Sequence, residues 1–199
     1  NVGYGVSASR TGLPSFGYDG TRKSSKSEYM GLQQYWLGLL MNESARKNRE
    51  LWGAIRKRAR VPEEIVERVE RLGGHWHLLV LSEDWCGDAV NTVPVVAALA
   101  DAARNVDLRV LARDENPDLM DAHLTNGTRS IPIVIVYDAA FRELGWWGPR
   151  PGELQGWATT IGRTLEKDER YRHIRTWYAR DRGRTTLNEV LDVVERATA

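Results

Sequence analysis

The stretch that decides the fold spans residues 82–89 and reads Ser-Glu-Asp-Trp-Cys-Gly-Asp-Ala. Residues 76–81 before it form an apolar run that predicts a buried strand, and residues 90–103 after it follow a helical pattern. Cys86 therefore stands between the end of a strand and the start of a helix. The unpaired N–H groups at a helix start favour thiolate over thiol. This context favours a reactive, exposed cysteine over a small buried core residue.

Strands and helices alternate on the C-terminal side of this stretch. Residues 106–111, 131–137 and 141–147 are predicted strands, and residues 117–124 a helix. From Gly152 the chain is expected to return to helix as far as Arg180. Gly183 breaks that helix, and residues 187–197 form a last one. Such alternation predicts an α/β protein in which helices cover a sheet.

The N-terminal part has two different patterns. Residues 1–27 are mostly Gly, Ser, Thr and Lys without periodicity, and are interpreted as an arm. The arm is expected to pack on its own domain, although a swapped arm that grips a second subunit of a homodimer is the alternative. Its expected anchors are Tyr4, Phe16 and Tyr18.

Residues 28–60 show an amphipathic helical pattern, interrupted near Asn42. The polar side of this pattern is basic, which could bind an anion but is more typical of a solvated face. Pro62 opens a further predicted helix, which Gly73 and Gly74 end.

Composition narrows the classes of function. The chain has 199 residues, one cysteine and a net charge of +1. The near balance of charge gives no reason to expect binding to nucleic acid or to a membrane. A lone cysteine excludes an intramolecular disulfide, and the sequence shows neither a bilayer-spanning run nor a signal peptide. We therefore expect a cytoplasmic protein.

These features resemble the thioredoxin fold over residues 78–151. The stretch 82–89 is similar to the thioredoxin active-site segment, and residues 113–117 to the turn between the next strand and helix. Residues 129–132 resemble the loop that ends in a cis-proline. Gly148 matches the glycine beside the groove that holds an extended substrate. The resemblance implies a central mixed sheet flanked by helices, with extra helices at both ends.

A narrower resemblance extends further along the chain. It is to a bacterial group of single-cysteine thioredoxin-like proteins with no settled function, and its motifs lie at residues 84–88, 124–127, 147–151 and 177–181. We expect one thioredoxin-like domain over residues 28–199, with a helical extension at 28–74, the core at 75–162 and C-terminal helices at 163–199.

Departures from the family pattern alter the expected chemistry. Ala89 occupies the position of the second, resolving cysteine, and Val80 that of a buried carboxylate. Asp88 replaces a proline; it could raise the pKa of Cys86, accept a proton or only stabilise the helix start. The opposing effects of the helix and Asp88 lead us to expect a thiol moderately more acidic than a free one. Cys86 and Asp88 are the candidate catalytic residues.

The resemblance also implies a substrate groove. Ile131, before the expected cis-Pro132, would offer its backbone to an extended peptide. Arg129 and Arg150 would flank the groove, where they could meet a carboxylate or phosphate or instead pair with Glu83 or Asp84. The other groove residues are Trp85, Gly87 and Gly148.

Other candidate residues are weaker. His75 and His77 alternate at a strand start, but no third ligand is spaced to join them, so no metal and no cofactor are expected. His123 and His173 are interpreted as surface or packing residues. The tryptophans at 146, 147, 157 and 177 are expected to pack the C-terminal helices on the sheet.

The function expected from these residues is monothiol thiol–disulfide exchange at Cys86 with a protein or low-molecular-weight thiol. An added thiol must release the mixed disulfide, because Ala89 cannot. The alternative is a non-catalytic peptide-binding module in which Cys86 is incidental. A monothiol carrier of an iron–sulfur cluster ranks below both, since no basic loop suits the required external thiol.

Overall fold

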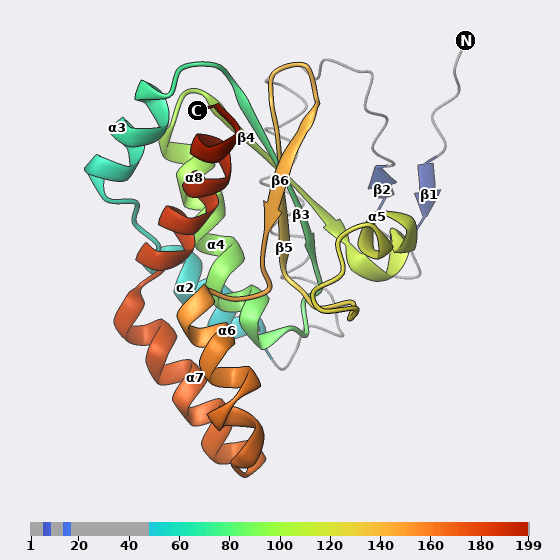
Figure 1. The fold of residues 1–199 in the computed structure, drawn as a ribbon, viewed down its shortest axis with the longest axis vertical. Helices are drawn as coiled ribbons and strands as arrows, with labels where there is room; N and C mark the ends of the chain where they lie inside the picture. Colours follow the sequence, from blue (N-terminus) through green and yellow to red (C-terminus); the bar gives the residue numbers. More distant parts are fainter. Residues whose placement is uncertain (1–5, 9–13, 17–47, 199) are drawn as a thin grey trace.

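The computed structural model describes residues 6–8, 14–16 and 48–198 of the chain. Its main sheet has four strands in the spatial order β4-β3-β5-β6. β3 runs parallel to β4, whereas the β3–β5 and β5–β6 pairs are antiparallel. The bounds of the strands are β3 (Trp76–Ser82), β4 (Val106–Ala112), β5 (Ile133–Tyr137) and β6 (Glu143–Trp147) (Figure 1). This mixed sheet flanked by helices confirms the expected α/β thioredoxin fold.

The helix that follows Cys86 connects the two parallel strands. A parallel pair cannot be joined by a tight turn and needs a crossover. That crossover is α4 (Gly87–Ala102), with Cys86 as its N-cap residue. Cys86 therefore lies where the chain leaves β3 and enters α4, as the sequence predicted.

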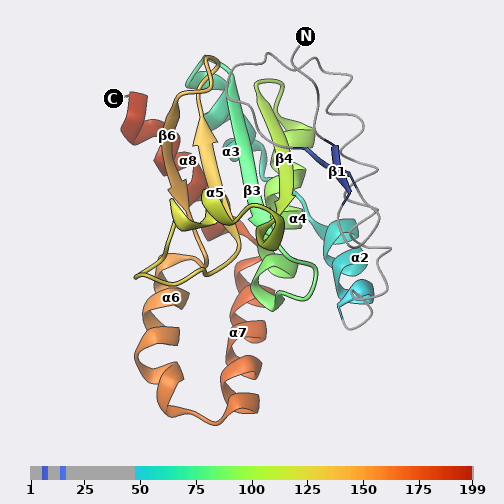
Figure 2. The ribbon, with the colours of Figure 1, turned by 90° about the vertical axis from the view of Figure 1, so that its right-hand side faces the viewer.

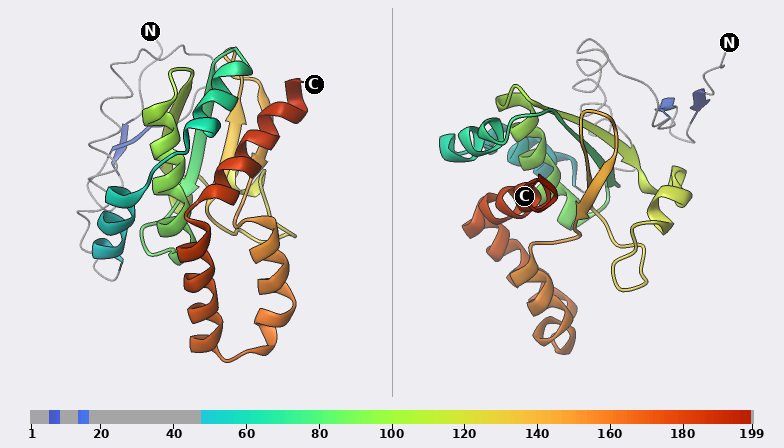
Figure 3. Two further views of the ribbon diagram at one scale, coloured as in Figure 1. Left: turned by 90° about the vertical axis from the view of Figure 1, so that its left-hand side faces the viewer. Right: turned by 45° about the horizontal axis from the view of Figure 1, so that its top comes forward.

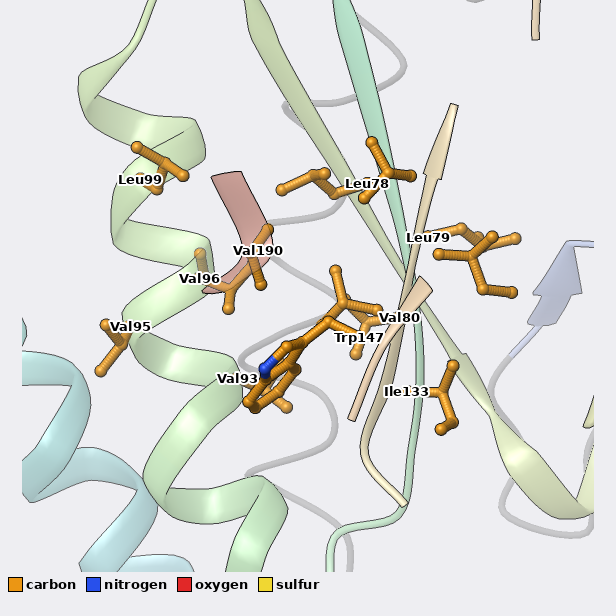
Figure 4. Close-up of a cluster of buried hydrophobic side chains, with 14 of the residues drawn as sticks. Leu78, Leu79, Val80, Val93, Val95, Val96, Leu99, Ile133, Trp147 and Val190 are labelled. Atoms are coloured by element: carbon orange, nitrogen blue, oxygen red, sulfur yellow. The ribbon is translucent and has the colours of Figure 1, made fainter. Parts of the chain in front are cut away.

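A layer of apolar side chains joins the sheet to its helices. α4 and α8 (Arg184–Thr198) cover one face, and the short α5 (Pro117–Asp121) lies on the other side (Figure 1). Side chains of α4, α8 and the sheet meet in the core that Figure 4 shows. Val80, Val93, Val96, Leu99, Ile133 and Val190 in that view are fully buried.

Among the residues that the structure describes, two helices precede the main sheet. α2 (Arg49–Arg58) packs against α4 and ends two residues before the predicted Arg60, and residues 28–47 of the predicted helical segment lie outside the described residues. α3 (Glu63–Arg71) follows Pro62 as predicted and is joined to α8 through Arg68. The Arg68 guanidinium donates hydrogen bonds to Glu195, Asp192 and Asn188 at 2.6–2.9 Å.

The prediction of one helix over residues 152–180 is wrong. The structure has α6 (Gly152–Thr159), a 3-10 turn (Ile161–Thr164) and α7 (Lys167–Asp181), which together form a hairpin that projects from the domain (Figures 2 and 3). Thr160 breaks the helix with φ −110° and ψ −91°. A Cβ added to Gly162 would lie only 2.9 Å from the ring of Trp157, so the turn packs closely on that ring.

The hairpin has a small apolar cluster of its own. Leu154, Ile174 and Tyr178 are buried there, with Trp157 and Trp177 packed against them. These two tryptophans therefore pack α6 against α7, and not the helices on the sheet as expected. Trp147 does behave as expected, since it is buried in the main core and its Nε1 donates to Glu189 of α8 at 2.6 Å.

Several predicted boundaries shift by a few residues for local reasons. α5 ends at Asp121 and not at residue 124, ahead of a turn in which Asn126 has φ 49°. β5 begins after Pro132, which has no N–H to donate to a ladder. β6 begins at Glu143, because Phe141 occupies the turn with φ 59°.

The N-terminal arm contains a short antiparallel pair that its composition did not indicate. β1 (Val6–Ala8) pairs with β2 (Pro14–Phe16). Tyr4, Tyr18 and the side chain of Phe16 lie outside the described part of the chain. The anchoring role of the arm and its part in a homodimer stay predictions.

Candidate functional site

The sulfur of Cys86 lies between the start of α4 and the loop that precedes β5. Its Sγ accepts the N–H of Ala89 at 3.5 Å, and the thiol donates to the carbonyl oxygen of Ile131 at 3.4 Å. Cys86 adopts extended angles, φ −79° and ψ 117°, as an N-cap residue does. The residue is 8% exposed and therefore buried, so the expectation of an exposed cysteine is wrong.

Burial controls the acidity of this thiol. Desolvation raises the pKa of Cys86 above its ordinary value, and the Asp88 carboxylate raises it further. The Ala89 N–H and the Arg150 guanidinium act in the opposite direction, but the net pKa is raised. The expectation of a moderately acidic thiol is therefore wrong, because it counted the helix start and Asp88 but not desolvation.

Asp88 is held in a partly buried ion pair with Arg150. The Arg150 Nε donates to Oδ1 at 2.9 Å and its Nη2 to Oδ2 at 2.5 Å, which is a two-pronged contact. The hydroxyl of Tyr178 donates to Oδ1 at 3.1 Å. Burial and the neighbouring carboxylate raise the pKa of Tyr178, so its hydroxyl remains a donor. Asp88 is therefore a neutralised carboxylate close to the thiol.

The network joins the C-terminal hairpin to the start of α4. Arg150 follows β6, and its Nη1 also donates to Gln155 of α6 at 3.0 Å, whereas Tyr178 belongs to α7. The expected alternative pairing of Arg150 with Glu83 or Asp84 is wrong, because α6 and α7 bring it to Asp88. Tyr178 lies in the motif at 177–181, but its contact with Asp88 could not be predicted from the sequence.

Pro132 and Gly148 form the wall beside the thiol. The Ile131–Pro132 bond is cis, as is Gly148–Pro149. Gly148 has φ 135°, and a Cβ added there would lie 2.2 Å from the carbonyl oxygen of Pro132. The two backbones are in such close contact that a side chain at residue 148 has no room.

The outer surface of the site is formed by Trp85 and Arg113. Trp85 is 52% exposed, and the Arg113 guanidinium lies 5.0 Å from the centre of its ring. Arg113 also donates to the carbonyl oxygen of Arg129 at 3.2 Å. A Cβ added to Gly87 would meet nothing within 4 Å, so the surface above the helix start is open. Arg113 lies in the turn at 113–117, but the sequence did not indicate its contact with Trp85.

Arg129 is paired with Asp121. It forms a two-pronged pair with Asp121, with both N–O distances at 2.6 Å, and both side chains are about half exposed. The expected alternative pairing with Glu83 or Asp84 is therefore wrong for Arg129 too. The pair joins the loop before Pro132 to the end of α5.

The N-terminal helix positions the loop that carries the motif. The Asn48 Nδ2 donates to the carbonyl oxygen of Trp85, and the Trp52 Nε1 to that of Asp84, both at 3.0 Å. Trp52 is buried in the main core. In the sequence Trp52 is only part of a helical pattern, because its partner Asp84 is more than thirty residues away.

The two positions that distinguish this site from a dithiol one are apolar and fully buried. Val80 and Ala89 both have no exposed surface. Where a dithiol thioredoxin would carry a buried carboxylate and a second thiol, this chain has two buried hydrocarbon side chains. Any resolving thiol must therefore come from another molecule.

The histidines are placed differently from one another. His123 is buried and forms hydrogen bonds with Leu119 and Glu143. The ring of His173 stacks on that of Trp157, with 3.7 Å between the ring centres. Both histidines therefore pack as expected. The statement that no third ligand joins His75 and His77 is wrong. Asp107 of β4 lies opposite His77, which sequence spacing could not reveal before the register of the strands was known.

In the part of the chain that the structure describes, no helix is long and apolar enough to cross a bilayer.

Comparisons with known proteins agree with this geometry. A family model described as thioredoxin matches residues 40–170. Among solved structures, a protein of unknown function from Pseudomonas aeruginosa has a TM-score of 0.62 at 20% identity, covering 88% of this chain and 99% of that one. An HIV epitope scaffold has a TM-score of 0.62 at 18% identity, with 86% and 98% covered. These two likenesses show the fold alone, and no curated protein matches the chain.

Proposed function

Because this chain belongs to the thioredoxin family, we propose that it carries out monothiol thiol–disulfide exchange through Cys86. The partner is a protein or low-molecular-weight thiol or disulfide. The observation that carries the proposal is the position of Sγ, between the N–H of Ala89 and the carbonyl of Ile131. There it lies at a helix start and beside the wall formed by Pro132 and Gly148.

The exchange proceeds in two displacements. Cys86 first loses its proton, and the thiolate attacks one sulfur of the partner disulfide while the other sulfur leaves as a thiolate. A second, external thiol then attacks the mixed disulfide at the partner sulfur and releases Cys86. A reducing compartment such as the cytoplasm supplies that thiol, and we place the reaction there.

The chain's own groups have distinct roles in the first displacement. The hydrogen bond from the thiol to Ile131 is lost on deprotonation, whereas the bond from Ala89 N–H remains and stabilises the thiolate. Arg150 offsets the charge of Asp88, which would otherwise oppose ionisation. Because burial raises the pKa of Cys86, the reaction is slow at neutral pH and speeds up as pH rises.

A second function is favoured by one observation, that Cys86 is buried while the neighbouring Trp85 is 52% exposed. A peptide-binding module would use Trp85 and the Arg113 guanidinium above it as its contact surface. The peptide would lie along the backbone of Ile131 by strand addition. In that case Cys86 would be a packing residue.

The test is to mix the reduced protein with oxidised glutathione and follow the adduct by intact mass spectrometry. Exchange predicts a stable mixed disulfide at Cys86 that persists until a thiol is added, and none in Cys86→Ser. Failure to form the adduct at alkaline pH would support the binding module. Catalytic reduction of a protein disulfide without an added thiol would contradict the missing resolving cysteine.

A further inference from the structure

Three potential metal ligands meet at the end of the sheet far from Cys86. His77 lies on β3 and His75 just before it, so the two side chains, two residues apart, project from the same face. Asp107 on β4 is the direct register partner of His77. A seven-residue strand spans about 23 Å, so this cluster is separate from the site that begins after Ser82.

The ligand atoms are already close together. The His75 Nε2 and Asp107 Oδ2 are 2.5 Å apart, and the His77 Nδ1 is 3.7 Å from the same oxygen. All three ligand atoms lie within 4.8 Å of one another. Donors on a tetrahedral ion with bonds of about 2.0–2.1 Å are about 3.4 Å apart. The two N–O distances bracket that value, so small rotations of the side chains would complete three bonds.

We propose that His75, His77 and Asp107 form a binding site for a divalent transition-metal ion of the Zn²⁺ class. Two imidazoles and a carboxylate match the nitrogen and oxygen donors that this ion takes, and three protein ligands leave a fourth position for water. The side chains of His75, His77 and Asp107 are 38%, 14% and 23% exposed, so an ion can enter from solvent.

The surroundings hold the ligands in place. The ring of His77 stacks on that of Phe141, with 4.1 Å between the ring centres and an interplanar angle of 4°. The neighbouring carboxylate of Asp138 is committed to its turn, where it accepts the N–H groups of Ala140 and Arg142 and the Arg142 Nε. Asp107 is therefore the carboxylate that the geometry assigns to the ion.

Zinc bound here would link the start of β3 to the start of β4. An ion that binds the folded chain more tightly than the unfolded chain raises the melting temperature by mass action. The site is far from the thiol, so we expect Zn²⁺ binding to persist when Cys86 is replaced. The inference thus does not depend on the exchange reaction.

The test is titration of Cys86→Ser protein with Zn²⁺ by calorimetry, since this background removes the thiol as a competing ligand. We expect one ion per chain, and a Co²⁺ absorption band of a low-coordinate N/O site. Asp107→Asn and His77→Ala each remove a direct ligand and should weaken binding by at least the roughly 10–100-fold that loss of an outer-shell partner costs. His173→Gln, which removes an exposed histidine on α7, should leave binding unchanged.

Two results would overturn the proposal. One is the lack of stoichiometric binding to the folded Cys86→Ser chain. The other is binding that Asp107→Asn leaves intact. Circular dichroism of each variant separates loss of the site from loss of the fold, and Asp107→Asn retains the shape of the side chain if His77→Ala does not fold.

Discussion

Arg150 donates hydrogen bonds to both carboxylate oxygens of Asp88, at 2.9 and 2.5 Å. Asp88 lies two residues after Cys86. The two side chains are 24% and 12% exposed, so water screens their charges only in part. The thiol of Cys86 therefore experiences a neutralised pair and not a lone carboxylate. Removal of Asp88 and removal of Arg150 should therefore shift the pKa of Cys86 in opposite directions, so the two variants together test the site.

Asp88→Asn should lower the pKa of Cys86. The substitution removes the carboxylate that raises this pKa and leaves the Arg150 guanidinium, which lowers it. Alkylation by iodoacetamide at neutral pH should become several-fold faster, measured as a rate against pH. High salt should reduce the difference only slightly, because the groups are partly buried. Asp168→Asn, an exposed carboxylate on α7, is the charge-matched control. An unchanged rate in Asp88→Asn would show that its charge does not act on the sulfur.

Arg150→Met should have the opposite effect on the thiol. Asp88 is then left without its counter-charge, so the pKa of Cys86 should rise and alkylation should slow. The unpaired carboxylate should also lower the free energy of unfolding by about 1–3 kcal/mol, measured by urea denaturation. Arg129→Met removes the exposed pair with Asp121 and should cost less than about 1 kcal/mol. Faster alkylation in Arg150→Met would contradict the assigned network.

Ala89→Cys should convert the monothiol site into a dithiol one. The N–H of residue 89 is 3.5 Å from the Cys86 sulfur, so a second sulfur lies within reach of the first. We expect an internal disulfide on oxidation and turnover of a protein disulfide with dithiothreitol as reductant. Because Ala89 has no exposed surface, the larger side chain should cost about 1–3 kcal/mol of stability. Free thiols that persist after oxidation would rule out this geometry.

Gly148→Ala should destabilise the wall beside the thiol. The new Cβ would lie 2.2 Å from a backbone oxygen at a φ of 135°, and neither can be relieved by rotating a side chain. We expect a loss of at least about 2 kcal/mol in the free energy of unfolding. Gly156→Ala is the matched control, since its Cβ meets nothing and it lies within α6. That control should be neutral or stabilising by up to about 1 kcal/mol.

The pH dependence of the wild-type protein follows from the raised pKa of Cys86. A higher pKa means less thiolate at neutral pH than in a free cysteine. The alkylation rate, relative to free cysteine, should therefore be low at neutral pH and approach the free value as pH rises through the raised pKa. An alkylation rate at neutral pH above that of free cysteine would show that the pKa of Cys86 is lowered and not raised.

Local sequence was sufficient for the features that depend on neighbours along the chain. The apolar run before Cys86 and the helical pattern after it predicted β3, α4 and the N-cap position of the cysteine, which the structure confirms. Gly148 was identified from its motif, and its contact with Pro132 gives the physical reason for a glycine there. A period of two or of 3.6 residues is a local property, whereas the reason for a glycine at residue 148 is a contact that only the folded chain makes.

Tertiary structure alone decided the acidity of the Cys86 thiol and which residues surround it. Arg150 and Tyr178 reach Asp88 at the start of α4 from 62 and 90 residues away in sequence, and Trp52 reaches Asp84 from 32 residues away. Likewise, Asp107 meets His77 only through the register of β3 with β4. Burial is a property of the packed chain, because a side chain loses water only when distant segments cover it. The sequence therefore determined where the thiol stands, and the packing determined how strongly it holds its proton.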